Sequence, residues 1–253
     1  DGLWTQPVPL VRLDRQPGAT MSLTVGGESV KLTPGGNATL ALRNPGRTEV
    51  KGAPLVFGGY GVADALRGFG AYDGVDLRGK VVLVLANDPD YEAGRDLGFE
   101  GRRMVVAGRV GSKFEVAARA GALGVLVIHE DEAASYPFMQ VASGDALPTF
   151  VLAPPKPSPL QFTGWLRGDA ASELLARTGL DLASLKQRAR DPAFRAFAIE
   201  GATVSAAGDA KATEFVSHNV LARITGSSRP DEYVLYGAHW DANGRNGPDA
   251  KGD

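Results

Sequence analysis

The chain has 253 residues, of which 43% are hydrophobic and 22% charged, proportions typical of a globular protein with one large domain or two small ones. Lys and Arg number 27 against 29 Asp and Glu, so the formal net charge is -2, and no run of like charge favours a nucleic-acid backbone or an anionic membrane surface. Cysteine is absent, which excludes disulfides and thiolate metal sites and leaves His and carboxylates to hold any metal. The longest apolar run, residues 81–86, is too short to span a bilayer.

The first part of the chain predicts short strands followed by a buried strand. Residues 1–50 are rich in Gly, Pro and Thr, and the runs TMSLTVGG and ESVKLT are typical of strands separated by turns. APLVFGGYGV then predicts a strand that enters a glycine-dense loop. KVVLVLAND, residues 80–88, is a β-branched and Leu run that predicts a buried strand.

Residues 112–132, SKFEVAARAGALGVLVIHEDE, predict a helix, a turn and a strand. Ser112 is the expected N-cap, because its hydroxyl can accept a hydrogen bond from a first-turn amide. Phe114 and Ala117 follow at helical spacing, and Gly121 is the expected end of the helix. The strand GVLVIH then forms a β–α–β unit with residues 80–86, which predicts parallel pairing.

The second part of the chain predicts two helices and two further strands. PPKPSPL is a proline-rich connector, and DAASELLARTG follows as a helix with Asp169 as its cap and Gly179 as its end. DLASLKQRARD places Leu182 and Leu185 on one helix face. Residues 200–213 are interpreted as a loose stretch and a candidate domain boundary, before the predicted strands SHNVLARITG and DEYVLYGAH.

The three histidines are the candidate metal ligands. His239 closes a predicted strand, and Asp241 at i+2 projects from the same side of an extended chain, where it can accept the second ring N–H of a metal-bound His. The same H-x-D pattern is also typical of a strand-end His bonded to a turn. His129, followed by Glu-Asp-Glu, is interpreted as a solvated strand end, and His218 as part of a turn that enters a strand.

Other motifs give little support for a site. Asp249 and Asp253 lack the spacing of a calcium-binding EF-hand loop, so we interpret the segment that contains them as a turn. The glycine-rich segment FGGYGV does not match a phosphate-binding loop, because no GK[ST] follows it. The sequence also lacks the G-x-S-x-G motif of a serine hydrolase.

Several segments, taken together, resemble a known family. APLVFGGYGV, YDGVDLRGKVVLVL and SKFEVAARAGALGVLVIHE resemble the protease-associated domain, which is inserted into zinc aminopeptidases of the glutamate carboxypeptidase and transferrin receptor kind. SHNVLARITGS and DEYVLYGAHWD resemble, in the same order, the opening strands of the catalytic domain of those enzymes. The resemblance covers about residues 50–253, and residues 1–50 resemble the lead-in of bacterial members.

The resemblance implies an α/β fold in three parts. Residues 1–50 would be a strand-rich lead-in packed on the protease-associated domain. Residues 51–212 would be that domain, a β-rich swivelling β/β/α sandwich with a helical extension. Residues 213–253 would be the first strands of an open α/β/α zinc peptidase sheet.

The resemblance also implies a function. Family members hydrolyse peptide bonds with a water activated by two zinc ions, and a glutamate is the general base. His239 matches the family's zinc ligand and Asp241 the residue that orients it. The protease-associated domain would shape the access of the peptide substrate, and the expected location is periplasmic or extracellular.

The sequence departs from the family after the H-x-D motif. The bridging Asp, the Glu pair and the second His of the family occur in contexts that are absent here, and neither Asp249 nor Asp253 takes the bridging role. We therefore expect a piece of a longer enzyme, inactive without the C-terminal catalytic portion as its partner. The alternatives to an enzyme are a non-catalytic binding module and a receptor-like homologue. Among partners, a second copy of the chain in a homo-oligomer is a further alternative. The H-x-D pair favours an enzyme over a receptor-like homologue, because an inactive site has no need of an oriented imidazole.

Overall fold

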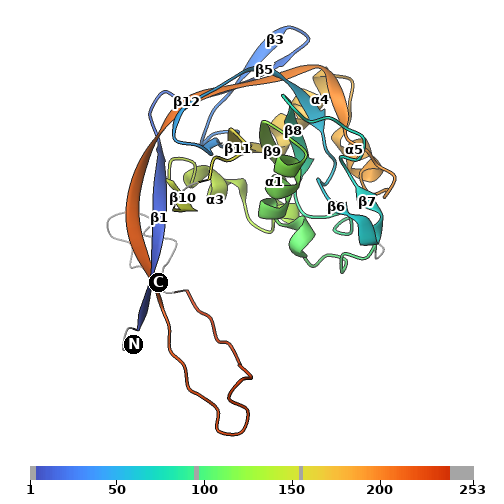
Figure 1. The fold of residues 1–253 in the computed structure, drawn as a ribbon. Helices are drawn as coiled ribbons and strands as arrows, with labels where there is room; N and C mark the ends of the chain where they lie inside the picture. The colour runs from blue at the N-terminus through green and yellow to red at the C-terminus, as the bar shows by residue number, and fades with distance from the viewer. Residues whose placement is uncertain (1–3, 94–96, 154–155, 240–253) are drawn as a thin grey trace. The chain divides into compact units, whose positions relative to one another are not determined.

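The computed structural model describes residues 4–93, 97–153 and 156–239, which fall into two compact units. The larger unit is Val8–Ser217, and the smaller joins Asp1–Pro7 to His218–Asp253. The described residues form a mixed α/β fold with a ten-stranded mixed sheet and five α-helices (Figure 1). The expected α/β class is therefore confirmed, while the predicted boundaries at 50/51 and 212/213 stay predictions.

The first strands confirm the expected pattern of strands and turns. β1 spans Thr5–Arg15, and β2 (Thr20–Val25) and β3 (Glu28–Leu32) form an antiparallel hairpin. Gly26 and Gly27 make its two-residue turn with φ of 57° and 87°. A turn with positive φ at both positions follows the strand twist, and glycine adopts it without steric cost.

The remaining elements follow in chain order. The other strands of the large sheet are β4 (Ala41–Leu42), β5 (Gly46–Phe57), β8 (Val81–Leu85), β9 (Gly124–His129), β10 (Thr149–Leu152), β11 (Phe162–Arg167) and β12 (Phe197–Val220). β6 (Ala63–Asp64) and β7 (Phe69–Gly70) form a separate pair. The helices are α1 (Val110–Arg119), α2 (Asp131–Ala134), α3 (Phe138–Ser143), α4 (Gly168–Arg177) and α5 (Leu182–Arg188), with short 3-10 turns η1 (Ala65–Arg67) and η2 (Val106–Gly108).

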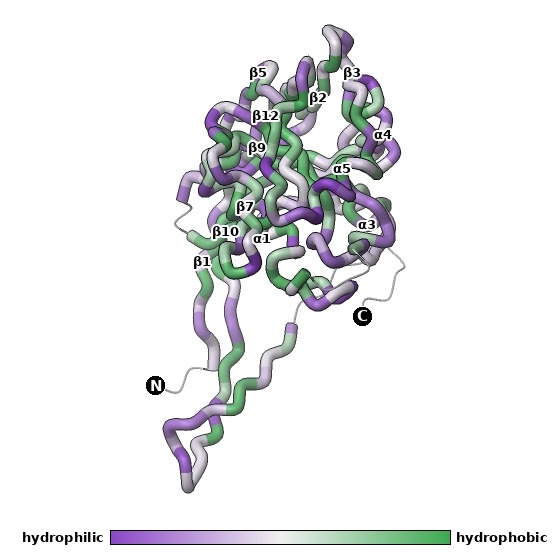
Figure 2. The backbone as a smooth tube through the Cα atoms, turned by 90° about the vertical axis from the view of Figure 1, so that its right-hand side faces the viewer, coloured by the Kyte–Doolittle hydropathy of each residue, from purple (hydrophilic) through white to green (hydrophobic). Residues whose placement is uncertain are grey.

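Four neighbouring parallel strands form the centre of the sheet, in the order β5-β8-β9-β11. Every residue of β8 and β9 is buried, and hydrophobic (green) segments of the tube lie around the label of β9 in Figure 2. The predicted buried strand at 80–86 and its parallel pairing with GVLVIH are confirmed, with Val81 opposite Gly124. Antiparallel strands flank this centre on both sides.

Helices cover both faces of the parallel strands. Alternate residues of a strand point to opposite faces, so Val127 packs in one apolar cluster with Ala117 of α1. Ile128 packs in the other cluster with Leu175 of α4 and with α5. No helix in the described part of the chain is long and apolar enough to cross a membrane.

Both predicted helix caps are wrong, by three residues for Ser112 and by two for Asp169, because the N-cap positions are Arg109 and Arg167. α1 begins at Val110, and the hydroxyl of Ser112 lies inside its first turn and donates to the carbonyl of Val106 at 2.7 Å. Asp169 likewise lies within the first turn of α4, where it accepts from the amide of Ala170 at 2.7 Å. Its carboxylate still faces the positive end of the helix dipole, so the sequence signal was real but its position was not fixed.

The predicted helix ends are confirmed. Gly121 and Gly179 have φ of 89° and 74°, the left-handed conformation that ends a helix at low cost with glycine. Asp181 caps α5 by accepting from the amide of Ser184 at 2.8 Å, and the predicted inward residues Leu182 and Leu185 are buried.

The predicted loose stretch at 200–213 is wrong. These residues lie inside β12, a strand of 24 residues that pairs with β2 and β5. Ala202, Val204 and Ala206 are buried at alternate positions. Small residues and interspersed glycines hid this period, and pairing on both sides of the strand supplies the hydrogen bonds that stabilise it.

The smaller unit is described by itself over residues 4–7 and 218–239. The amide of Leu221 donates to the carbonyl of Trp4 at 2.9 Å, but residues 221–239 form neither helix nor strand. The predicted strand DEYVLYGAH is therefore not formed, and Leu235 and Tyr236 are 93% and 91% exposed. An isolated extended segment has no partner for its backbone groups, so its composition alone does not make it a strand.

A buried ion pair joins three distant segments of the larger unit. Arg15, the last residue of β1, binds the carboxylate of Asp145, which follows α3, and the two side chains are only 16% and 5% exposed. Asp145 also accepts from the amide of Leu40 at 2.6 Å, and Arg15 donates to the carbonyl of Leu40. Replacing only one of the two residues strongly destabilises the fold, because the charge of the other then stays buried without a partner.

We expect Asp145→Ala to lower the free energy of unfolding by about 3 kcal/mol, measured by urea denaturation. Asp14→Ala is the control, because Asp14 pairs with Arg12 while both side chains stay accessible, at 29% and 49% exposed. It should cost less than about 1 kcal/mol. Equal losses for the two variants would contradict the structural role of the buried pair.

Candidate functional site

Polar residues gather where the central parallel strands end. Asn87, Asp88 and Asp90 follow β8, and an acidic segment at 130–132 follows β9. Since parallel strands end at the same edge of a sheet, these two segments are neighbours, and this edge is where open α/β sheets bind ligands. We therefore treat the edge as the candidate functional site.

Asp90 orders the loop after β8. Its buried carboxylate accepts from the amides of Leu97, Phe99 and Gly101 at 2.6, 2.7 and 3.2 Å. Asp88 Oδ1 in turn accepts from the amide of Asp90 at 3.1 Å. The loop is thus held by its own carboxylates, and its polar groups have defined positions.

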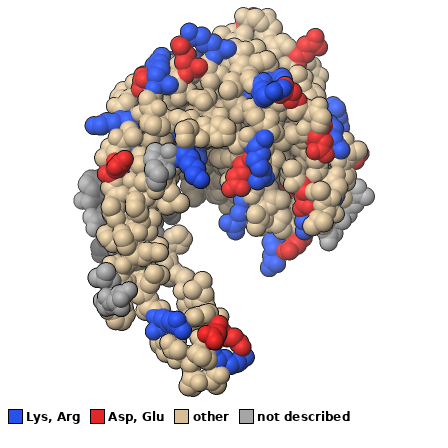
Figure 3. All heavy atoms as spheres, in the orientation of Figure 1, with Lys and Arg blue, Asp and Glu red and all other residues tan. Residues whose placement is uncertain are grey.

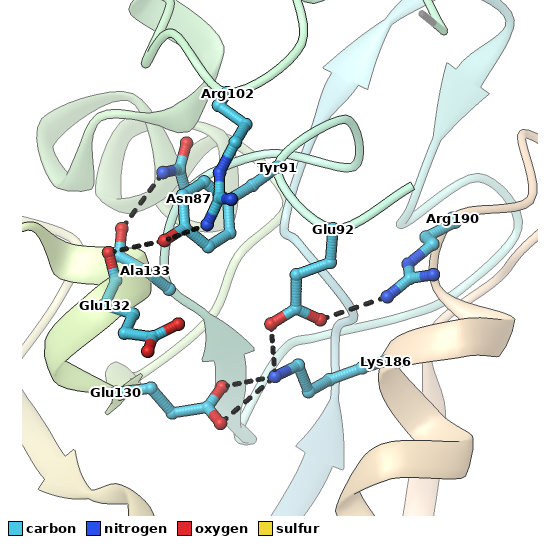
Figure 4. A network of polar contacts seen from close by, with 9 residues as sticks. All are labelled: Asn87, Tyr91, Glu92, Arg102, Glu130, Glu132, Ala133, Lys186 and Arg190. Carbon is cyan, nitrogen blue, oxygen red and sulfur yellow. Dashed lines mark hydrogen bonds and ion pairs between the residues drawn. The ribbon is translucent and has the colours of Figure 1, made fainter. Parts of the chain in front are cut away.

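Side chains join this loop to the segment after β9 (Figure 4). Asn87 donates from Nδ2 to the carbonyl of Ala133 at 2.9 Å, and the hydroxyl of Tyr91 donates to the carbonyl of Glu132 at 2.7 Å. Arg102 donates to the Tyr91 hydroxyl at 3.3 Å and lies over its ring. The two strand ends therefore form one surface.

A charged cluster extends the same surface to α5. Lys186 binds Glu92 and Glu130, at 2.5 and 2.9 Å, and Arg190 binds Glu92 at 3.0 Å (Figure 4). Burial by itself lowers the pKa of Lys186, but its hydrogen bonds with the two carboxylates outweigh burial and the pKa is raised. Lys186 is therefore a fixed cation that holds the loops together, and it cannot serve as a proton carrier near neutral pH.

Lys113 of α1 is the most unusual group beneath the site. Its side chain is fully buried, and Nζ donates to the carbonyls of Tyr60 and Asn87. Burial lowers the pKa of Lys113 to about 7, against the opposing effect of the charge on Asp88. Lys113 thus links the helix to both the glycine loop after β5 and the loop after β8.

Asp88 is buried beside this lysine. Burial raises the pKa of Asp88 to about 6, although amide hydrogen bonds from Asp90 and Val105 oppose the shift. Its Oδ2 atom has no hydrogen-bond partner among the residues that the structure describes. Two groups with pKa values moved toward neutrality at the end of a buried strand are typical of functional sites.

The glycines of FGGYGV pack this loop against the sheet. Gly59 has a φ of 58°, and a Cβ there would lie 2.6 Å from the ring of Phe194. A Cβ at Gly58 would lie 2.7 Å from Val82. Only glycine permits this approach, which brings the carbonyl of Tyr60 within reach of Lys113.

A pocket of about 650 Å³ opens at the edge, within the size range of small-molecule sites. Its walls include Asn87, Arg109, Glu115, Tyr136 and Trp165. The pocket combines two aromatic side chains with one cation and one anion, so it can accept a small polar ligand or a peptide side chain.

The interpretation of His129 as a solvated strand end is wrong. The ring is buried and packs against Tyr136, Phe138 and Trp165, with ring centroids 5.2–5.4 Å away. Neither ring nitrogen has a hydrogen-bond partner in the described part of the chain, although Nδ1 lies 3.4 Å from Asp131. Burial lowers the pKa of His129 and so favours the neutral ring, although the charge of Asp131 acts in the opposite direction.

Of the predicted metal-site pair, only His239 lies among the described residues. His239 is exposed in the irregular segment at 221–239, and Asp241, like Asp249 and Asp253, lies outside the described residues. His218 is exposed within β12 and not in a turn. Among residues 4–93, 97–153 and 156–239, no group of three His, Asp or Glu side chains could hold a metal ion.

Sequence analysis did not identify Lys113 as a buried group. One signal was present, because Lys113 lies four residues before Ala117, on the helix face that contacts the sheet. The neighbouring Phe114, which was expected to face the core, is only half-buried.

No protein-family model and no curated protein matches the chain. The resemblance to protease-associated domains and zinc aminopeptidases therefore stays a prediction.

Replacing Lys113 by Met should change how stability depends on pH. Because the pKa of Lys113 is about 7 in the folded protein and about 10.4 when unfolded, the unfolded chain binds more protons between these values. The contribution of Lys113 to stability therefore rises with pH across this window. The free energy of unfolding of the natural chain minus that of Lys113→Met, measured in urea at pH 6, 7.5 and 9, should increase. A difference that is flat or falls would contradict the buried position of the amine.

Proposed function

We propose that the chain is the protease-associated part of a secreted zinc-dependent aminopeptidase, together with the beginning of its catalytic part. In this proposal the domain shapes the access of peptides to a site that needs further residues. The 253-residue chain by itself does not hydrolyse peptide bonds. The expected location of the enzyme is periplasmic or extracellular.

The observation that carries the proposal is the placement of the segments that resemble the protease-associated domain. They supply β5, β8 and β9, which are neighbouring strands in the centre of the sheet, and α1, which packs on one face of it. A chance resemblance spread over unrelated parts of a fold would have no reason to form one packed unit. The polar surface at the ends of these strands gives that unit a place to contact a peptide.

The expected inactivity has a separate basis. A zinc site in a protein generally takes three or four protein ligands. Of the predicted pair only His239 is described, and the described residues contain no cluster that fits a metal. We therefore assign no hydrolytic step to these residues.

The pocket of about 650 Å³ favours a second candidate function. It could make the chain a binding module without chemistry of its own, which captures peptides through Tyr136, Trp165, Arg109 and Glu115. The two candidates differ in whether zinc and hydrolysis accompany binding.

The test compares the 253-residue chain with the product of the complete gene. Hydrolysis of leucyl-p-nitroanilide and bound zinc are measured for both. The complete product should hydrolyse the substrate, hold two zinc ions and lose activity in EDTA, whereas the 253-residue chain should be inactive.

His239→Ala in the complete product should lower kcat about 100-fold or more, since even partners of metal ligands contribute 10- to 100-fold. His218→Ala is the matched control, because His218 is an exposed histidine on β12, and it should leave kcat unchanged. A complete product that binds peptides without zinc or hydrolysis would replace the enzyme by the binding module.

A further inference from the structure

A second pocket, of about 320 Å³, lies inside the larger unit and shares Trp165 with the first as a lining residue. We call it the Arg43 pocket. Arg43 follows β4, whose pairing with β11 and the bond from the Arg43 amide to the carbonyl of Gln161, at 3.1 Å, hold the backbone in place. The ends of β1 and α3 supply Arg15 and Asp145, which also line the pocket.

The charges of this pocket do not balance. Arg15 and Asp145 bind each other and compensate. Arg43 forms no ion pair, side-chain hydrogen bond or ring contact with any residue that the structure describes. The pocket walls thus carry two guanidinium groups and one carboxylate, an excess of one positive charge.

An unpaired arginine in this position is unusual for the molecule. On the face shown in Figure 3, most Lys and Arg side chains neighbour an Asp or Glu. Arg109 and Arg119 also lack a partner in the described part of the chain, but both are exposed to water, whereas Arg43 is half-buried. Water therefore compensates the other two charges better than it compensates that of Arg43.

Burial of this guanidinium has an energetic consequence. Loss of water lowers the pKa of Arg43, and no opposing charge offsets the shift. Arginine nevertheless stays protonated in proteins, so the charge persists. A partly desolvated cation gains more from an anion than a fully hydrated one does, since the attraction is less screened.

The rest of the pocket is suited to an apolar group. Leu147, Val141, Phe114 and Trp165 contribute to its walls, and its volume lies at the lower end of the range for small-ligand sites. The planar fork of a guanidinium binds a carboxylate through two parallel hydrogen bonds. An excess of one positive charge matches a monoanion and not a doubly charged phosphate.

We propose that the Arg43 pocket binds a carboxylate that carries an apolar body, with Arg43 as the group that holds the carboxylate. The carboxyl end of a peptide and a free branched-chain carboxylic acid share this chemistry. The proposal goes beyond the function proposed above and is independent of zinc.

The test is isothermal titration of the 253-residue chain at low salt in EDTA, so that no metal contributes. The probes are N-acetyl-leucine, N-acetyl-leucinamide, 4-methylpentanoate and inorganic phosphate. N-acetyl-leucine should bind saturably. N-acetyl-leucinamide has the same apolar side chain but no carboxylate charge, and its affinity should be lower by about tenfold or more. Equal affinity for 4-methylpentanoate indicates a site for free acids, and a preference for N-acetyl-leucine indicates a peptide end.

Arg43→Gln should weaken binding of N-acetyl-leucine about tenfold or more without lowering the thermal midpoint, because Arg43 has no protein partner to lose. Arg119→Gln is the matched control, because Arg119 is likewise unpaired in the described part of the chain but is exposed and lines neither pocket, and this variant should bind as the natural chain does. Three results would overturn the proposal: no saturable binding of N-acetyl-leucine, equal binding of the amide, or tighter binding of phosphate. Unchanged binding by Arg43→Gln would do the same.

Discussion

Parallel strands in this protein must be covered on both faces, and the rest of the larger unit follows from that constraint. Every residue of β8 and β9 is buried, so one face needs α1 and the other needs α4 and α5. The chain runs from β8 through a long loop and α1 to β9, so loops and the short helix α2 lie at the carboxyl ends of these two strands. That is where the polar loops, the pair Lys113 and Asp88, and the larger pocket lie.

Charge is used in two opposite ways in this unit. Lys113 and Lys186 are buried or half-buried, and both have protein partners, so they connect elements and hold the strand ends in place. Arg43 is half-buried without such a partner, in a pocket whose other charges compensate each other. Removing one partner of the lysine contacts would leave a buried charge uncompensated, whereas the proposed carboxylate would supply the partner that Arg43 lacks in the described part of the chain.

The proposed function and the carboxylate site concern different parts of the molecule. Peptide hydrolysis would depend on zinc ligands, of which the described residues supply only His239, whereas the Arg43 pocket lies wholly within Val8–Ser217. A carboxylate site in a protease-associated domain would let an acid or a peptide end act on the domain without occupying the catalytic centre. The two proposals can therefore fail separately.

The sequence by itself determined the elements whose stability is local. The buried strand at 81–86, the short strands and turns around 20–33 and the glycines that end α1 and α4 were all predicted, because period, turn chemistry and positive φ depend on neighbouring residues. Only the tertiary structure decided that 200–213 is a strand, that DEYVLYGAH is not, and that His129 and Lys113 are buried. A strand exists only where another strand pairs with it, and a polar side chain is buried only where distant segments cover it. Neither condition can be derived from the residues on either side.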